Sequence, residues 1–243
     1  SEGVMVARGD LAVEIGDALL VGVQKDIIKH TRRLNRIVIT ATQMMESMIT
    51  SPMPTRAEVS DVANAVMDGT DAVMLSAETA VGDFPAQTVE AMARVCLGAE
   101  QHHKAYKSSH RLDITVHSID ESVALSAMYA ANHLEGVKAI ICMTQTGKTP
   151  LLMSRIRSVI PIFAFTPQAE TQRRVCLYRG VITHPFDSEV LDNAKVNHIA
   201  VEQLKELGVV QDGDIVLITK GDYVKAHGGT NTLKVVRVGN HIQ

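Results

Sequence analysis

The sequence predicts an α/β protein built in two parts, and two patterns carry that prediction. Short apolar runs alternate with longer segments whose apolar residues recur at helical spacing, as strands and helices do when they follow one another along a chain. Between residues 104 and 118 this periodicity is lost in a stretch rich in His, Ser, Lys and Arg, and the alternation restarts beyond it. We therefore expect one domain over residues 1–109 and a second over residues 110–243.

Three strand–helix units make up the first part. Its opening run, GVMVA, is almost continuously apolar, which is typical of a parallel strand buried on both faces. Thr55 followed by Glu58 forms a capping box before one of the helices, and Gly69 marks the end of that helix. The expected strands lie at residues 3–7, 37–40 and 71–75, and the helices that follow them at residues 17–35, 57–67 and 87–104.

The second part begins with another capping box, Ser118 and Glu121, and it ends differently from the first. Its expected helices lie at residues 118–134, 149–157, 168–178 and 192–207, and its strands at residues 139–143, 162–165, 181–183, 214–219 and 232–238. Only a loop separates the last two strands, so we expect them to pair antiparallel and to make the sheet mixed.

Composition excludes several classes of protein. A net charge of −3 and an aromatic content of 3% without tryptophan give neither a basic excess nor stacking platforms for nucleic acid. No apolar run approaches the ~18 residues of a membrane helix, and no signal peptide opens the chain, so we expect a cytoplasmic protein without a membrane partner. The cysteines are scattered in apolar contexts, which predicts buried free thiols at Cys96, Cys142 and Cys176.

Polar residues follow the first expected strand at once. Gly9 lets backbone approach a ligand closely, the Asp10 carboxylate can bind a hard cation, and the Arg8 guanidinium can orient either. α/β folds keep their chemistry at this end of their strands. On these residues alone, an ordinary strand-to-helix turn with Asp10 in water fits equally well.

The second and third expected strands are also followed by polar residues. Thr42, Ser76 and Glu78 fall at the same strand end as Asp10, so their side chains can converge on one site. Serine and threonine also favour helix N-caps, and Thr42 and Ser76 fit that role as well. We interpret three methionines nearby as core packing: Met44, Met45 and Met48.

A loop in the second part has the features of a phosphate site. The segment from Thr144 to Thr149 follows an apolar strand and opens a helix, an arrangement that binds phosphate on backbone amides. It ends like a Walker A loop, but Cys142 occupies the place of the first glycine, so we expect no NTPase. A plain helix start is the alternative.

Four ordered motifs resemble those of the pyruvate kinase family. They are ARGDL from Ala7, ITATQMMESM from Ile39, MPTRAE from Met53 and AVMLSAET from Ala72. The second part also resembles that family's C-terminal domain, and the segment from Lys220 to Gly229 is longer than in animal forms, which favours a bacterial type.

The resemblance implies a TIM-type barrel, but a closed barrel of eight units takes about 250 residues and the first part supplies only three units. We therefore expect the last three βα units of such a barrel followed by a separate α/β domain with a mixed sheet. In the family, the catalytic lysine, a second metal carboxylate, the potassium ligands and the nucleotide-contacting arginines precede this region. The chain by itself is therefore expected to be inactive.

The activity that the resemblance implies is transfer of a phosphoryl group from phosphoenolpyruvate to ADP, giving pyruvate and ATP in glycolysis, with Mg²⁺ or Mn²⁺ as cofactor. Asp10 would bind the metal, and the amides of Gly9 and Asp10 with the Thr42 hydroxyl would cradle the substrate carboxylate. Thr42 would lie nearest the enolate carbon, and Ser76 would belong to a water-linked proton relay. K⁺ would bind through residues outside this chain.

Two further residues are expected to contact substrate by the same resemblance, Arg8 and Glu78. Arg8 fits the role of a structural ion-pair partner equally well. In the family, the loop of the second domain holds the phosphate of an allosteric effector, which makes its expected effector-binding residues Thr144, Thr146, Gly147, Lys148 and Thr149.

The family assembles as a homotetramer, so we also expect a homo-oligomer. The alternative to an enzyme is a non-catalytic effector-binding and assembly module derived from it.

Overall fold

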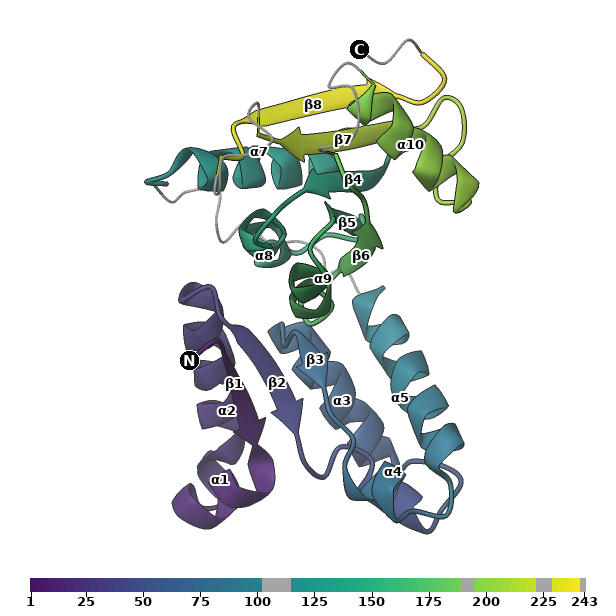
Figure 1. Ribbon diagram of the computed structural model, residues 1–243. Helices are drawn as coiled ribbons and strands as arrows, with labels where there is room; N and C mark the ends of the chain where they lie inside the picture. The colour runs from purple at the N-terminus through teal and green to yellow at the C-terminus, as the bar shows by residue number, and fades with distance from the viewer. Residues whose placement is uncertain (102–114, 189–194, 222–228, 241–243) are drawn as a thin grey trace. The chain divides into compact units, whose positions relative to one another are not determined.

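The computed structural model describes residues 1–101, 115–188, 195–221 and 229–240 (Figure 1). These residues form two compact units, Ser1–Lys107 and Ser108–Gln243. The domain boundary expected after residue 109 lies outside the described residues. No helix in the described part of the chain combines the length and the apolar character needed to cross a bilayer.

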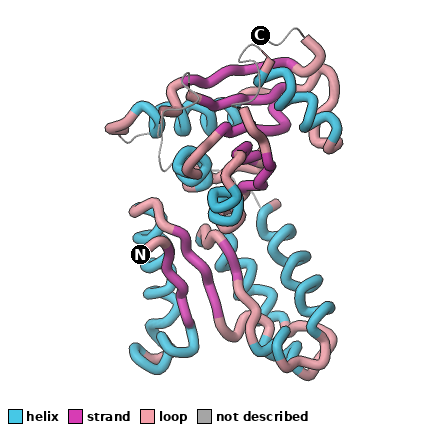
Figure 2. Tube along the Cα trace, viewed as in Figure 1, coloured by secondary structure: helices cyan, strands magenta, loops and turns pink. Residues whose placement is uncertain are grey.

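The first unit is built on three parallel strands, each followed by helix, as the sequence predicts (Figure 2). Strand β1 pairs with β2 from Gly3 opposite Ile37 to Ala7 opposite Ala41. Its elements in chain order are β1 (Gly3–Ala7), α1 (Arg8–Ile15), α2 (Asp17–Arg33), β2 (Ile37–Ala41), the 3₁₀ turn η1 (Glu46–Ile49), α3 (Arg56–Asp68), β3 (Ala72–Val73), α4 (Ala77–Ala80) and α5 (Pro85–Glu100).

Two details of the first unit differ from the sequence prediction. Arg8 opens helix α1 directly instead of a turn, and Gly16, at φ +82°, ends α1 and allows α2 to begin. Strand β3 is shorter than residues 71–75, although Met74 N–H still donates to Thr40 O at 3.0 Å. The predicted end of the last helix, near residue 104, lies outside the described residues.

Glu58 fixes both a helix start and a loop. Its carboxylate accepts from Thr55 N–H at 2.7 Å while Glu58 N–H donates to the Thr55 hydroxyl, which confirms the predicted capping box of α3. The same carboxylate accepts from the Ser47 N–H at 2.7 Å, which holds η1 beside the helix. The core interpretation of three methionines is also confirmed, because no surface is exposed at Met44, Met45 or Met48.

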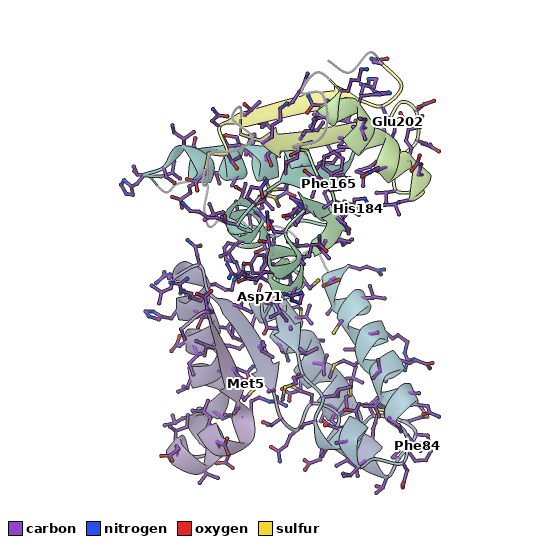
Figure 3. All side chains as sticks on the ribbon, in the orientation of Figure 1. Met5, Asp71, Phe84, Phe165, His184 and Glu202 are labelled. Atoms are coloured by element: carbon purple, nitrogen blue, oxygen red, sulfur yellow. The ribbon has the colours of Figure 1, made fainter. Side chains whose placement is uncertain are left out.

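The outer strands of the first sheet each have an unpaired edge within the described residues, because only three strands pair there. Met5, which is labelled on β1 in Figure 3, is 53% exposed. Apolar residues on the helices are exposed as well, with Val13 at 86% and Leu97 at 62%. The TIM-type barrel that the sequence predicts closes with eight strands. In such a barrel, further strands and helices would cover the edges and faces that are open in this unit.

The second unit contains a five-stranded sheet in the order β6-β5-β4-β7-β8. Neighbouring strands are parallel except β7 and β8, which are antiparallel, so the prediction of a mixed sheet is confirmed. Its elements are α7 (Ile119–His133), β4 (Val137–Met143), α8 (Lys148–Ser154), β5 (Ile162–Thr166), α9 (Ala169–Val175), β6 (Val181–Pro185), α10 (Val196–Glu206), β7 (Ile215–Lys220) and β8 (Thr232–Arg237).

Helices cover both faces of this sheet. Helix α10 buries Ala200, Val201 and Leu204 in one cluster with alternate residues of β4, β5 and β7. The residues between them, such as Ile140 and Leu217, are fully buried too, and α7 packs against β4, β7 and β8. Helices α8 and α9 end three residues before their predicted ends, and the predicted start of α10 near residue 192 lies outside the described residues.

The cysteines are free but differ in exposure. Cys142 lies in the middle of the sheet, where burial raises the pKa of its thiol to about 12. Cys96 is half-buried, and Cys176 is exposed, so the prediction of a buried thiol was wrong there. Cys176 follows the last residue of α9, Val175, which takes the buried position, and the Cys176 Sγ donates to Gln172 O at 3.2 Å.

Candidate active site and effector loop

A hydrogen bond between a backbone amide and a side-chain hydroxyl links the segments that follow β1 and β2. Gly9 N–H, in the first turn of α1, donates to Thr42 Oγ1 at 3.0 Å, and the Thr42 hydroxyl donates to Ala41 O at 2.7 Å. The first amides of a helix have no partner within the helix, so Thr42 satisfies one of them from the neighbouring strand. This bond fits the alternative role of Thr42 as a helix cap, and the cradle for a substrate carboxylate stays a prediction.

Thr42 and its neighbour have an unusual backbone conformation. Thr42 lies at φ +66° and Gln43 at φ +52°, both in the left-handed region that β-branched residues in particular avoid. Such residues persist only where their surroundings hold them, and they cluster at functional sites. The strand end thus stores strain beside the predicted substrate cradle.

The Arg8 side chain holds Thr42 and Gln43 in place through hydrogen bonds to their carbonyls. Its guanidinium is buried, with Nε and Nη2 donating to Thr42 O at 3.1 and 2.8 Å and Nη2 donating to Gln43 O at 2.7 Å. Nη1 donates to the Asp61 carboxylate of α3. These contacts match the structural ion-pair interpretation of Arg8, and its contact with substrate stays a prediction. The sequence analysis missed Asp61, because no local motif distinguishes it from other polar residues of a helix.

Asp10 lies in the first turn of α1 and is exposed. A carboxylate there interacts favourably with the helix dipole, and it is also free to bind a cation from solvent. Among the described residues, no group of three or more His, Cys, Asp or Glu side chains could hold a metal ion. Mg²⁺ commonly binds through one or two carboxylates with waters and substrate phosphates, so a single aspartate from this chain fits such a site.

Glu78 is turned into the protein. Glu78 is 2% exposed, and its carboxylate accepts from Met45 N–H at 3.1 Å and from Ser76 N–H at 2.8 Å. Burial acts to raise the pKa of Glu78, but these and nearby backbone donors outweigh it and leave the pKa below its ordinary value. Glu78 therefore ties the segment after β2 to the segment after β3, and its substrate contact stays a prediction.

Ser76 lies half-buried beside Glu78, at the position before helix α4. Its side chain makes no capping hydrogen bond to that helix, so the capping alternative does not explain the serine. The proton-relay role of Ser76 stays a prediction.

The predicted effector loop is held by its own hydroxyls. Gly147 lies at φ +78°, and a Cβ there would be 2.9 Å from Val175 Cγ1, so the position requires glycine. Gly147 N–H donates to Thr144 Oγ1 at 2.9 Å, and Lys148 N–H donates to Thr146 Oγ1 at 3.4 Å. Two of the hydroxyls expected to contact phosphate, those of Thr144 and Thr146, thus accept from backbone amides of the same segment, and phosphate binding there stays a prediction.

The last two predicted effector residues reach other elements. The Lys148 ammonium is half-exposed and lies 2.7 Å from the carboxylate of Asp120, a buried residue of α7. Burial acts to raise the pKa of Asp120, but Lys148 and Ser118 lower it below its ordinary value. Thr149 shares a 2.8 Å hydrogen bond with Thr230. Asp120 was missed in the sequence because it lies inside a capping motif that explains the segment as a helix start.

The first unit has the parallel βα organisation of a barrel-type α/β protein, and the second is a separate α/β domain. A family model described as the pyruvate kinase barrel domain matches residues 1–89, and one described as the pyruvate kinase alpha/beta domain matches residues 121–236. The chain belongs to the pyruvate kinase family.

Relatives of known name cover nearly the whole chain. A pyruvate kinase II of Salmonella typhimurium is 58% identical over 98% of this chain and 49% of the relative, and a pyruvate kinase of Haemophilus influenzae is 59% identical over 96% and 48%. A solved pyruvate kinase from Cryptosporidium parvum superimposes with a TM-score of 0.84 at 38% identity, covering 98% of this chain and 47% of that one. The chain spans about half the length of the curated relatives it matches.

Proposed function

We propose that this chain supplies two parts of a pyruvate kinase: one side of the active site and the effector domain. The complete enzyme transfers a phosphoryl group from phosphoenolpyruvate to ADP and releases pyruvate and ATP. The observation that carries the proposal is the bond between Gly9 and the strained Thr42, next to the exposed carboxylate of Asp10, in a chain 58% identical to a pyruvate kinase II.

Each residue has a role in this proposal. Phosphoryl transfer depends mainly on positioning the reacting groups and on neutralising their negative charge. A bound Mg²⁺ or Mn²⁺ would supply the positive charge. Asp10 would hold the ion as one of its carboxylate ligands. The first amides of α1, at Gly9 and Asp10, belong to the positive end of that helix and suit the carboxylate of the substrate, which would share Gly9 N–H with the Thr42 hydroxyl. Thr42 would donate or relay the proton that the enolate carbon takes up, with Ser76 linked to it through water.

In the second unit, the loop from Thr144 to Thr149 would bind a phosphorylated effector. Lys148 carries the charge for that contact, and phosphate would compete for it with the carboxylate of Asp120. A homo-oligomer, a tetramer in the family, and a cytoplasmic location complete the proposal. We assign no residue of this chain to K⁺.

The test is substitution of Asp10 in the full-length enzyme that contains this chain. Asp10→Asn removes a full charge from the metal site and should lower phosphoenolpyruvate-dependent ATP formation by orders of magnitude. Glu14→Gln is the matched control, because it removes the same charge from an exposed position of the same helix. Near-normal turnover of Asp10→Asn at saturating metal would remove Asp10 from the site.

A further inference from the structure

The Arg8 side chain connects three elements of the first unit. Arg8 lies at the start of α1, its acceptors Thr42 O and Gln43 O lie just beyond β2, and Asp61 lies on α3. The side chain of Arg8 is 7% exposed and that of Asp61 is 42% exposed. A guanidinium this buried needs an anion, because an uncompensated charge is costly to keep away from water.

The two carbonyls that Arg8 holds belong to the left-handed pair. One nitrogen, Nη2, donates to both Thr42 O and Gln43 O, which only a backbone with these two carbonyls close together allows. A left-handed conformation is unfavourable for threonine, so the bonds to Arg8 oppose its relaxation.

The opposite side of Thr42 is held by the residue next to Arg8. Gly9 N–H donates to the Thr42 hydroxyl, while Arg8 holds the carbonyl of the same residue. Two successive residues of α1 thus fix Thr42 at two atoms. If the guanidinium shifts, the carbonyl loses its donors and the hydroxyl is free to rotate away from Gly9.

We propose that Asp61 is a positioning residue: its carboxylate aims the Arg8 guanidinium at the Thr42 and Gln43 carbonyls and so keeps the Thr42 hydroxyl on Gly9. Asp61 itself reaches the site only through Arg8. The consequence for turnover rests on the proposed function, whereas the consequence for the Gly9 amide does not.

Helix α3 also offers a matched control. Asp68, at the end of the same helix, pairs with Lys25 of α2 at 2.6 Å, so it too links α3 to a neighbouring helix by an ion pair. Asp68→Ala removes one aspartate, one charge and one ion pair, as Asp61→Ala does, but it leaves Arg8 and its contacts in place.

The first readout is turnover of the full-length enzyme. Asp61→Ala should lower kcat for ATP formation by about tenfold or more, because small displacements of a positioned group cost that much, while the KM for ADP stays within about twofold. Asp61→Glu should recover part of the loss, since it restores a carboxylate for Arg8. Asp68→Ala should match the wild type in kcat.

The second readout does not depend on activity. The Gly9 amide has no acceptor within α1, so its protection from hydrogen–deuterium exchange depends on Thr42. Exchange resolved to Gly9 should be slow in the wild type and in Asp68→Ala and faster in Asp61→Ala. If Asp61→Ala fails to fold, Asp61→Asn should show the same change at smaller size.

Equal exchange at Gly9 in the Asp61 and Asp68 variants would overturn the proposal, as would equal kcat. A wild-type enzyme without turnover would instead refute the proposed function, and the exchange comparison would still decide the role of Asp61.

Discussion

The two compact units differ in how completely each covers its own sheet. In the second unit, helices α7 and α10 bury a five-stranded sheet, and its strands β4, β5 and β7 are largely inaccessible. In the first unit, three strands leave Met5 and helix residues such as Val13 exposed. The comparison teaches that the second unit buries the centre of its sheet between its own helices, whereas the three described strands of the first unit leave more of their sheet open.

The two candidate sites differ in how far apart in the sequence their contacting residues lie. The loop from Thr144 to Thr149 is fixed mainly by hydroxyls and amides a few residues apart. The site of the first unit is fixed by contacts between distant segments, such as Gly9 with Thr42 and Glu78 with Met45. We therefore expect effector binding to be a property of one unit and catalysis to be a property of a larger assembly.

The largest expected effect concerns association of the chain. The open edge of β1 should pair with another copy, so light scattering of this chain at high concentration should find dimers or larger species. Met5→Lys places a charge on that edge and should shift the chain toward monomer. Val235→Lys is the matched change on β8, the edge strand of the second unit, where Val235 is 52% exposed.

A clean monomer for the unmodified chain would contradict the expectation that the open edge of β1 pairs with another copy. If Val235→Lys rather than Met5→Lys dissociates the assembly, the second unit is the one that needs a partner.

The next effect compares two glycines. Gly147→Ala should lower the free energy of unfolding of the second unit by about 2–4 kcal/mol. The positive φ of Gly147 is unfavourable for alanine, and the added Cβ would clash with Val175 Cγ1. Gly9→Ala should leave stability nearly unchanged, because a Cβ there would meet only Thr42 Oγ1 at 3.8 Å. It should instead raise the KM for phosphoenolpyruvate in the full-length enzyme by crowding the substrate. Denaturant unfolding and steady-state kinetics measure the two outcomes.

A loss of stability in Gly9→Ala equal to that in Gly147→Ala would show that Gly9 serves the fold rather than a ligand.

The smallest effect concerns the effector. Calorimetry with a panel of sugar phosphates and nucleoside monophosphates should find a ligand whose affinity falls as salt is raised. Lys148→Ala should weaken that ligand by about 1.5–3 kcal/mol, since a charge-assisted contact to phosphate is lost. Lys205→Ala is the control, because Lys205 is also paired with an aspartate, Asp212, at 2.8 Å.

The Lys148 variant also leaves the buried Asp120 without its cation, so its melting temperature must be recorded without ligand. Equal binding to the wild type, to Lys148→Ala and to Thr149→Ala would reduce the loop to a helix start.

Much of the fold follows from local patterns in the sequence. Periodicity and the Thr55–Glu58 capping box predict α3 to within a residue at each end, and short connections predict the antiparallel pair β7 and β8. Helix α1 was missed because its start at Arg8 directly follows β1, and polar residues after a strand are more often a turn.

The site was predicted less completely than the fold. The motifs select Gly9, Asp10 and Thr42, because their chemistry is visible residue by residue. Contacts that join distant segments leave no local pattern, which is why Asp61 and Asp120 were found only in the structure. The positive φ of Thr42 is likewise imposed by its surroundings, against its own backbone preference.

We expect the first unit to supply part of an active site that other residues complete. The most direct measurement is phosphoenolpyruvate-dependent ATP formation by this chain alone and by the full-length enzyme, with mass spectrometry of both preparations. We predict turnover by the full-length enzyme and none by the chain alone. Robust turnover by a preparation that holds only these 243 residues would contradict the account. Absence of turnover in the full-length protein would contradict it as well and would favour a non-catalytic effector-binding module.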